Sequence, residues 1–169
     1  NVAAVERLYT EALSMIDDIE GKTVFDLYCG TGTITQALAL KAKKAVGVEI
    51  VEDAVEAARE NAKLNELDNC EFIAGDVLQV LDTLADKPDV IVVDPPRKGC
   101  EESLLETMVQ MLKYGVDQIL YISCNPKTLV ENLRFMEEHG YVIGDIKAYD
   151  NFPFTAHVEC AVLMSRKDT

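Results

Sequence analysis

Basic residues are scarce in this sequence. Its 169 residues include 16 lysines and arginines but 30 aspartates and glutamates, which gives a formal charge of −14. Non-specific binding to nucleic acid depends on neutralising phosphates, so this balance disfavours it. If the substrate is RNA, affinity must come from a local basic rim or from another domain.

Long hydrophobic runs are also absent, although 49% of the residues are hydrophobic. No apolar run approaches the roughly 20 residues that span a bilayer. Residues 1–13 have the pattern of an amphipathic helix and lack the features of a signal peptide. The composition predicts a globular domain without a membrane partner.

Metal-binding spacings of cysteine are missing as well. The five cysteines are scattered, and no CxxC or Cys/His spacing indicates zinc or a cluster. Free thiols favour a reducing, cytoplasmic location and no metal cofactor. Most of these cysteines are expected to be small buried hydrophobes, and Cys124 is the exception.

Strand-like apolar runs alternate with helical patterns along most of the chain. A lead-in helix is predicted at about residues 2–19, because its apolar residues follow the helical period. Strands are predicted at 23–27, 45–49, 70–74, 89–93 and 118–122, and helices at 33–42, 52–64, 77–84, 101–113 and 127–139. This alternation predicts a single α/β domain over 1–169, with a parallel sheet covered on both faces.

The end of the chain departs from this alternation. Two strand-like runs, 141–149 and 157–164, are joined by residues 150–154 with no helix between them. A hairpin is the natural connection, so the last strand should run antiparallel to the others. The result is a Rossmann-like, mostly parallel seven-stranded sheet with a C-terminal antiparallel hairpin.

A cofactor loop is predicted after the first strand. Gly30 and Gly32 allow a tight turn and a close backbone approach, but Thr35 makes the dinucleotide fingerprint incomplete. Glu49 ends the second strand, where it could accept hydrogen bonds from ribose hydroxyls. Asp76 follows the third strand and could meet an adenine amino group, cap the next helix, or do both. Jointly these features resemble Rossmann-like S-adenosylmethionine methyltransferases more than nicotinamide enzymes.

A reaction site is predicted at the ends of later strands. The run Asp-Pro-Pro-Arg at 94–97 follows the fourth strand, and its prolines stiffen the backbone. Methyltransferases of exocyclic amines have an aromatic residue where Arg97 stands, so that chemistry is disfavoured. Cys124 lies at the tip of the fifth strand and Glu159 lies on the last strand. A thiol and a carboxylate so placed suit covalent attack followed by proton removal. His157 is expected to be a structural histidine.

Four motifs occur in order: Asp-Leu-Tyr-Cys-Gly-x-Gly, Asp-Pro-Pro-Arg-Lys-Gly, Ser-Cys-Asn-Pro and Pro-x-Thr-x-His-Val-Glu. Together they resemble the RNA uracil-5 methyltransferase family, a class I methyltransferase family, over essentially the whole chain. The resemblance implies methylation of carbon 5 of a uridine in rRNA or tRNA, with S-adenosylmethionine as cofactor and no metal. It implies a nucleophile at Cys124, a base at Glu159, and Asp94 and Arg97 helping to form the site. The implied cofactor-binding residues are Asp26, Tyr28, Gly30, Gly32, Glu49, Asp76 and Asp94.

Two alternatives remain beside this interpretation. An RNA cytosine-5 methyltransferase would show Asp-Ala-Pro-Cys after the fourth strand and would lack the Glu159 motif, so uracil is favoured. An inactive cofactor-binding or interaction module is the other alternative. The resemblance also predicts that the N-terminal RNA-binding and central regions of the family are absent from this sequence, which starts at Asn1. RNA binding is then expected to require those regions.

Overall fold

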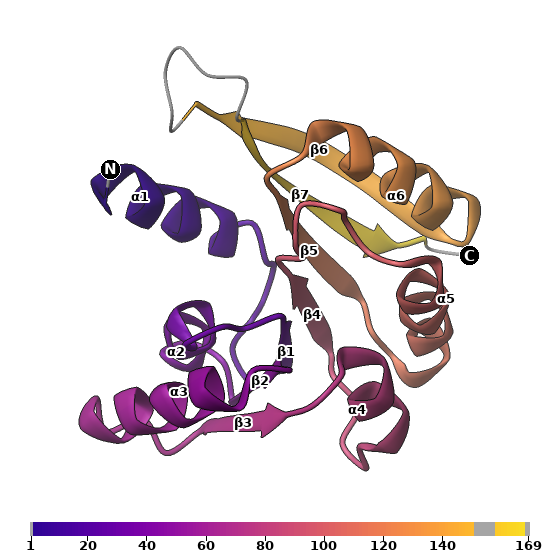
Figure 1. Ribbon diagram of the computed structural model, residues 1–169. Helices are drawn as coiled ribbons and strands as arrows, with labels where there is room; N and C mark the ends of the chain where they lie inside the picture. The colour runs from indigo at the N-terminus through magenta and orange to yellow at the C-terminus, as the bar shows by residue number, and fades with distance from the viewer. Residues whose placement is uncertain (1, 151–157, 168–169) are drawn as a thin grey trace.

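Seven strands form one sheet in the computed structural model, which describes residues 2–150 and 158–167 (Figure 1). The strands are β1 (Thr23–Leu27), β2 (Lys44–Glu49), β3 (Cys70–Ala74), β4 (Val90–Val93), β5 (Gln118–Ser123), β6 (Tyr141–Tyr149) and β7 (Glu159–Arg166). Their order across the sheet is β3-β2-β1-β4-β5-β7-β6. Strands β1 to β5 are parallel, and β7 lies antiparallel between β5 and β6. The predicted fold, including the antiparallel hairpin, is confirmed.

Helices cover both faces of this sheet (Figure 1). They are α1 (Val2–Leu13), α2 (Thr33–Ala39), α3 (Glu52–Leu64), α4 (Val77–Thr83), α5 (Glu102–Gln110) and α6 (Pro126–Glu138), with a 3₁₀ helix η1 (Met111–Tyr114) after α5. Residues of α4, α5 and α6 share one hydrophobic cluster with the sheet, and residues of α1 and α2 share another. Among the described helices, none is long and apolar enough to cross a membrane.

The central strands are apolar throughout because both of their faces are covered. All four residues of β4 and all six residues of β5 are buried. Strand β6 at the edge of the sheet is mostly exposed. Continuous burial at the centre explains why the sequence shows unbroken apolar runs there and no alternation.

The lead-in helix is shorter than predicted, since it ends at Leu13 and does not continue to about residue 19. Asp18 has a left-handed φ of 54° and Gly21 one of 80°, so the backbone turns before β1. The buried amide of Gln118 on β5 holds this turn, because it accepts from Asp17 N and donates to Asp17 O, both at 2.8 Å. This tertiary contact has no signal in the local pattern.

Several later boundaries also differ from the prediction. Helix α2 ends at Ala39, three residues before the predicted end at 42. Helix α5 gives way at Met111 to η1, before Gly115 with its φ of 91°. Strand β7 begins at Glu159, whereas the predicted start at 157 lies outside the described residues. These shifts change no neighbour in the sheet.

Candidate functional site

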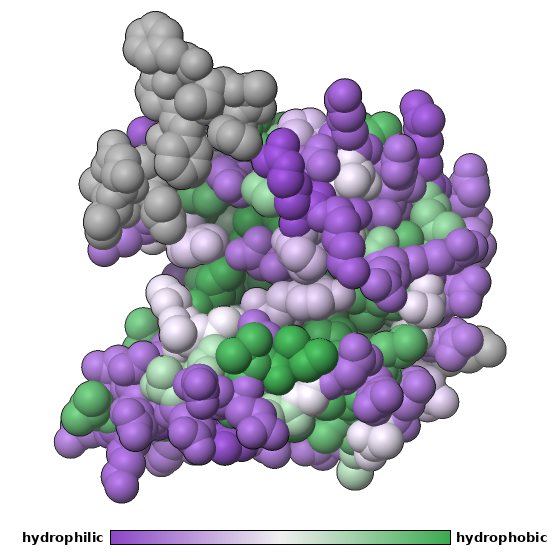
Figure 2. Space-filling model, in the orientation of Figure 1, coloured by the Kyte–Doolittle hydropathy of each residue, from purple (hydrophilic) through white to green (hydrophobic). Residues whose placement is uncertain are grey.

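A pocket of about 540 Å³ lies at the carboxyl ends of the first four strands. The strand order reverses there, since β1 and β4 are neighbours in the sheet but are separated by β2 and β3 in the chain. Open α/β sheets bind ligands at such a point. The face in Figure 2 is hollowed near its centre, and hydrophobic atoms gather beside the hollow. The pocket lining consists of Tyr28, Glu49, Ile50, Asp76, Val77, Leu78, Asp94, Pro95, Pro96, Lys98, Glu101, Ser103 and Leu104.

Four of the predicted cofactor residues line this pocket: Tyr28, Glu49, Asp76 and Asp94. They come from the ends of four different strands, so the fold assembles them. The sequence interpretation missed the apolar Ile50 and the start of α5 at Ser103 and Leu104. Ile50 directly follows Glu49 and its side chain is 64% exposed. Such exposure of a large apolar residue marks a binding surface, but it cannot be read from the sequence.

The glycine turn after β1 shapes the region behind this lining. Gly32 has a φ of 83°, and a Cβ there would lie 2.7 Å from Cε1 of Phe72. Tyr28, which is not glycine, also has a positive φ of 61°. Gly30 and Gly32 are not among the lining residues. Their role in this structure is to fold the turn tightly, and their contact with a cofactor stays a prediction.

The carboxylates of Glu49 and Asp76 are fixed by backbone groups. Glu49 accepts from Gly30 N through Oε1 and from Val51 N through Oε2, both at 3.2 Å. Asp76 caps α4, because its Oδ1 accepts from the backbone nitrogens of Leu78 and Gln79 at 3.1 and 3.3 Å. The capping role proposed for Asp76 is therefore real, and the same residue still lines the pocket. Carboxylate oxygens have further lone pairs, so both residues can also accept from ligand hydroxyls or amines.

Asp26 lies beneath the pocket and is fully buried. Its Oδ2 accepts a hydrogen bond from the Thr35 hydroxyl at 2.6 Å, whereas its Oδ1 has no hydrogen-bond partner among the described residues. Burial, together with the charges of Asp94 and Glu49, raises the pKa of Asp26 to about 7. Thr35, the residue that departs from the dinucleotide fingerprint, therefore has a structural role: its hydroxyl donates to Asp26. Direct contact between Asp26 and a cofactor stays a prediction.

The pairing of β5 with β7 brings the two ends of the predicted reaction site together. Ser123 of β5 is opposite Cys160 of β7. Cys124 directly follows the first of these residues and Glu159 directly precedes the second, so the pairing brings them to the same end of two adjacent strands. A separation of 35 residues along the chain is thus closed by one antiparallel pairing.

Electrostatic interactions link Cys124 and Glu159 to the loop after β4. Burial raises the pKa of the Cys124 thiol, Glu159 raises it further, and the guanidinium of Arg97 opposes both effects. Burial and the charge of Glu159 raise the pKa of Asp94 to about 7. Asp94, Arg97 and Glu159 therefore all lie within electrostatic reach of Cys124, and Asp94 also belongs to the pocket.

Cys124 is held in a defined turn before α6. Asn125 caps this helix by accepting from Lys127 N at 3.1 Å, and the Ser123 hydroxyl accepts from Asn125 N at 3.0 Å. The thiol therefore lies just before the N-terminus of a 13-residue helix. The positive end of a helix dipole favours the thiolate, as the guanidinium of Arg97 does.

Tyr9 on α1 is a neighbour of this site that the sequence interpretation did not single out. Burial raises the pKa of Tyr9 to about 12, with further contributions from the charges of Asp94, Glu159 and Asp26. Its phenol therefore stays protonated beside these carboxyl groups at neutral pH. From the sequence alone, Tyr9 is one more residue on the apolar face of the helix.

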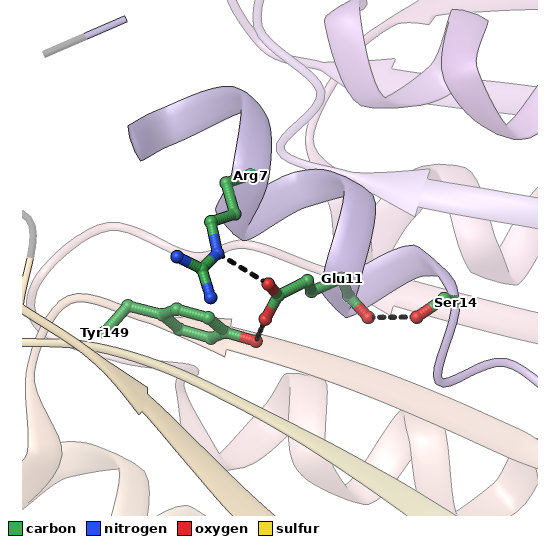
Figure 3. A network of polar contacts seen from close by, with 4 residues as sticks. All are labelled: Arg7, Glu11, Ser14 and Tyr149. Carbon is green, nitrogen blue, oxygen red and sulfur yellow. Dashed lines mark hydrogen bonds and ion pairs between the residues drawn. The ribbon is translucent and has the colours of Figure 1, made fainter. Parts of the chain in front are cut away.

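The position of α1 depends on a contact with the C-terminal hairpin (Figure 3). The hydroxyl of Tyr149 on β6 donates to Oε2 of Glu11 at 3.0 Å, and Arg7 Nε donates to Oε1 of Glu11 at 2.7 Å. Tyr149 is opposite Glu159 in the pairing of β6 with β7. Helix α1 is thereby attached beside the strand that carries Glu159. His157 lies outside the described residues.

In residues 2–150 and 158–167, no group of three or more histidine, cysteine, aspartate or glutamate side chains is arranged to hold a metal ion.

Comparison with known proteins agrees with this geometry. A methyltransferase domain family matches residues 18–166. The chain is 54% identical over 169 residues to an "uncharacterized RNA methyltransferase" of Clostridium tetani, covering all of this chain and 36% of that protein. It is 49% identical over 167 residues to a protein of the same description from Clostridium acetobutylicum, covering 99% of this chain and again 36% of the relative. The chain thus spans little more than a third of the length of these relatives.

A solved structure with similar architecture is the Pyrococcus abyssi tRNA (uracil-54, C5)-methyltransferase in complex with S-adenosyl-L-homocysteine. It has a TM-score of 0.75 and 30% sequence identity, and the match covers 92% of this chain and 37% of that one. A ribosomal protein L11 methylase from Lactobacillus delbrueckii has the same TM-score, with 21% identity over 96% of this chain and 79% of its own. That second likeness concerns the fold alone.

Proposed function

The chain belongs to the methyltransferase domain family, and we propose that it methylates carbon 5 of a uridine in structured RNA. The observation that carries this proposal is the pairing of β5 with β7, which brings Cys124 and Glu159 to the same end of two adjacent strands. Both lie within electrostatic reach of Asp94, which lines the pocket. The similarity to uncharacterized RNA methyltransferases and to an archaeal tRNA uracil-C5 methyltransferase supports the choice of substrate.

S-adenosylmethionine is the cofactor, in agreement with the family and with the S-adenosyl-L-homocysteine bound by the archaeal neighbour. The pocket fits such a molecule: its volume of about 540 Å³ is typical of cofactor sites. The carboxylates of Glu49 and Asp76 suit ribose hydroxyls and an adenine amino group, and Ile50 offers an apolar surface to the base. The cofactor supplies an electrophilic methyl group on a sulfonium.

The reaction begins at Cys124. Carbon 5 of uracil is a poor nucleophile, so the thiolate first adds to carbon 6 and forms a carbon–sulfur bond, which generates an enolate. The enolate would make carbon 5 nucleophilic, and that carbon would take the methyl group from the bound cofactor as the cofactor's methyl–sulfur bond breaks, which leaves a neutral thioether. Glu159 then removes the remaining proton from carbon 5, the carbon 5–carbon 6 double bond re-forms, and the thiolate leaves. Arg97 supports the first step, because its charge partly offsets the burial and the Glu159 charge that raise the pKa of the thiol.

The RNA partner is proposed to be rRNA or tRNA with the uridine unstacked in a loop, since the carbon-6 face must be reached by the thiol. We place most of the RNA affinity in the part of such proteins that this chain does not include. The charge of −14 and the 36% coverage of the relatives support this. A cytoplasmic location fits an RNA substrate and five free cysteines.

Incubation with RNA that contains 5-fluorouridine tests the proposal. Glu159 cannot remove fluorine as it removes a proton, so the full-length protein with S-adenosylmethionine should accumulate a covalent RNA adduct that survives denaturation. Cys124→Ala should abolish the adduct, and Cys70→Ala at the far edge of the sheet should leave it unchanged.

Other outcomes separate the alternatives. An adduct with 5-fluorocytidine RNA alone would indicate a cytosine-5 methyltransferase. No saturable binding of S-adenosylmethionine, together with no adduct, would indicate an inactive interaction module. An undiminished adduct in Cys124→Ala would remove Cys124 from its role as nucleophile.

A further inference from the structure

The loop that carries Asp94 and Arg97 is bound to α6 through a buried asparagine. Asn132 is only 8% exposed, and its Oδ1 accepts two hydrogen bonds. One comes from the backbone nitrogen of Cys100 at 3.0 Å and the other from the Tyr121 hydroxyl at 2.7 Å. The far end of the loop is thus joined to α6 and to β5 through a single oxygen atom.

A second attachment joins the middle of the loop to the turn that holds Cys124. The carbonyl oxygen of Arg97 accepts from Asn125 Nδ2 at 3.1 Å and from the Thr128 hydroxyl at 3.4 Å. Asn125 immediately follows Cys124 and caps α6. The same first turns of α6 therefore contact the reaction-site loop at two points and fix the position of the thiol.

The loop also packs closely against these side chains. Gly99 has a φ of 80°, and a Cβ at this position would lie 3.0 Å from both Oδ1 of Asn132 and Cβ of Thr128. Close packing and the hydrogen bonds together fix the position of the loop relative to α6. Since Asp94, Pro95, Pro96, Lys98 and Glu101 of this segment line the pocket, that position also shapes the cofactor site.

We propose that Asn132 is a positioning residue for methyl transfer. It holds the loop 94–101 so that Asp94 and Arg97 face Cys124, and it thereby couples the cofactor pocket to the nucleophile. This inference rests on the proposed function. Asn132 touches neither reactant, and it acts through the loop and through Tyr121.

The hydrogen bonds from Cys100 N and from the Tyr121 hydroxyl both need an acceptor at position 132. The variants are therefore chosen to keep or to remove that acceptor. Asn132→Asp keeps an acceptor for both bonds, but it loses the Nδ2 group that donates to the Cys100 carbonyl at 3.5 Å and it buries a carboxyl group, so it should preserve the reaction only in part. Asn132→Leu keeps the volume but leaves the Cys100 N–H and the Tyr121 hydroxyl without this acceptor. Displacing a reaction-site group by about 1 Å costs on the order of 10²-fold in rate.

The experiment compares four variants of the full-length protein. The rate of adduct formation with 5-fluorouridine RNA is measured at saturating RNA and cofactor, and the affinity for S-adenosyl-L-homocysteine is measured by calorimetry. Asn132→Leu should slow adduct formation on the order of 10²-fold and weaken S-adenosyl-L-homocysteine binding, whereas Asn132→Asp should have a smaller effect on both. Tyr121→Phe should slow adduct formation less, and adding it to Asn132→Leu should slow the reaction no further.

Asn69→Leu is the matched control for loss of stability. Asn69 Nδ2 donates to the carbonyls of Ala39 and Ala42 at 2.8 and 3.3 Å, at the start of β3 and far from the reaction site. This variant should melt earlier yet form the adduct at the normal rate at 25 °C. If Asn132→Leu fails to fold, the Tyr121→Phe rate decides the question.

Normal adduct formation in Asn132→Leu or in Tyr121→Phe would overturn the inference. Failure of the proposed function has a different result, since the unaltered protein would then form no adduct at all.

Discussion

The two halves of the sheet position their functional groups by different means. In the half of β1, β2 and β3, the turn after β1 is set by backbone conformation, with a φ of 57° at Gly30 and 83° at Gly32. In the half of β4, β5 and β7, the loops are held by side chains such as Asn125 and Asn132, and the last strand returns antiparallel. Backbone turns suit a cofactor pocket, whereas the second half must align groups from distant segments.

The difference predicts how each half fails. Damage to the first half should reduce cofactor affinity and stability together. Damage to the second half should slow the reaction more than it weakens cofactor binding.

Gly32→Ala is expected to have the largest effect on stability, and it should disrupt the turn after β1 in the first half of the sheet. The new Cβ would lie 2.7 Å from the ring of buried Phe72, in a backbone conformation with a φ of 83°. Strain and overpacking together should lower the free energy of unfolding by about 2–5 kcal/mol. Urea unfolding and calorimetry with S-adenosyl-L-homocysteine measure the two losses.

Gly30→Ala is the matched control in the same turn. Its φ of 57° is also positive, but a Cβ would have nothing within 4 Å. Backbone strain alone should cost about 1–2 kcal/mol. Equal losses in the two variants would show that the contact with Phe72 does not matter.

Asp26→Asn should have a somewhat smaller effect, and its sign depends on pH. Asp26 has a pKa raised from 3.8 to about 7, so between these values the folded state keeps a proton that the unfolded state releases. Stability therefore falls as pH rises through this window, by up to about 4 kcal/mol for one such group. Asp94, with its pKa of about 7, contributes in the same direction.

The Asp26→Asn variant should consequently be more stable than the unaltered chain at pH 8. Between pH 4 and 7 its free energy of unfolding should fall by about half as much as that of the unaltered chain, because only Asp94 still contributes. Thermal unfolding across that range measures the slope. A steep fall that persists in full in Asp26→Asn would contradict burial of this charge. A large loss of S-adenosyl-L-homocysteine affinity would show instead that Asp26 contacts the cofactor directly.

Tyr149→Phe should have the smallest effect, and it tests how the second half of the sheet holds α1. It removes the hydroxyl that donates to Glu11 at 3.0 Å and holds α1 beside β7. Amide hydrogen exchange in α1 should quicken and adduct formation should slow slightly, with unchanged cofactor affinity. Arg7→Ala, which breaks only the exposed ion pair with Glu11, is the control. Equal exchange in both variants and the unaltered chain would mean that the Tyr149 contact does not hold α1.

The sequence was sufficient for the sheet and for four of the residues that line the pocket. Unbroken apolar runs indicated buried parallel strands, and the glycines with Glu49 and Asp76 marked their carboxyl ends. The antiparallel return also followed from the missing helix between the last two strands, and it is the reason why Cys124 and Glu159 were expected to lie near each other.

Other features could not be predicted because they depend on contacts between distant segments. The end of α1 is set by Gln118, which lies 101 residues from its partner Asp17. Tyr9 and Asn132 fit their helices as ordinary residues, and only the packing of α1 and α6 gives them a place at the site. The hydrogen bond between Thr35 and the buried carboxyl of Asp26 also had no signal in the sequence pattern.

The central claim is that Cys124 and Glu159 divide one reaction between attack and proton removal. Mass spectrometry of the Glu159→Gln variant with uridine RNA and S-adenosylmethionine tests it most directly. We predict a covalent complex in which Cys124 is bound to carbon 6 of a uridine that already has a methyl group on carbon 5, with turnover slowed about 10²–10⁴-fold. Normal turnover without such a complex would contradict the assignment of Glu159 as the base.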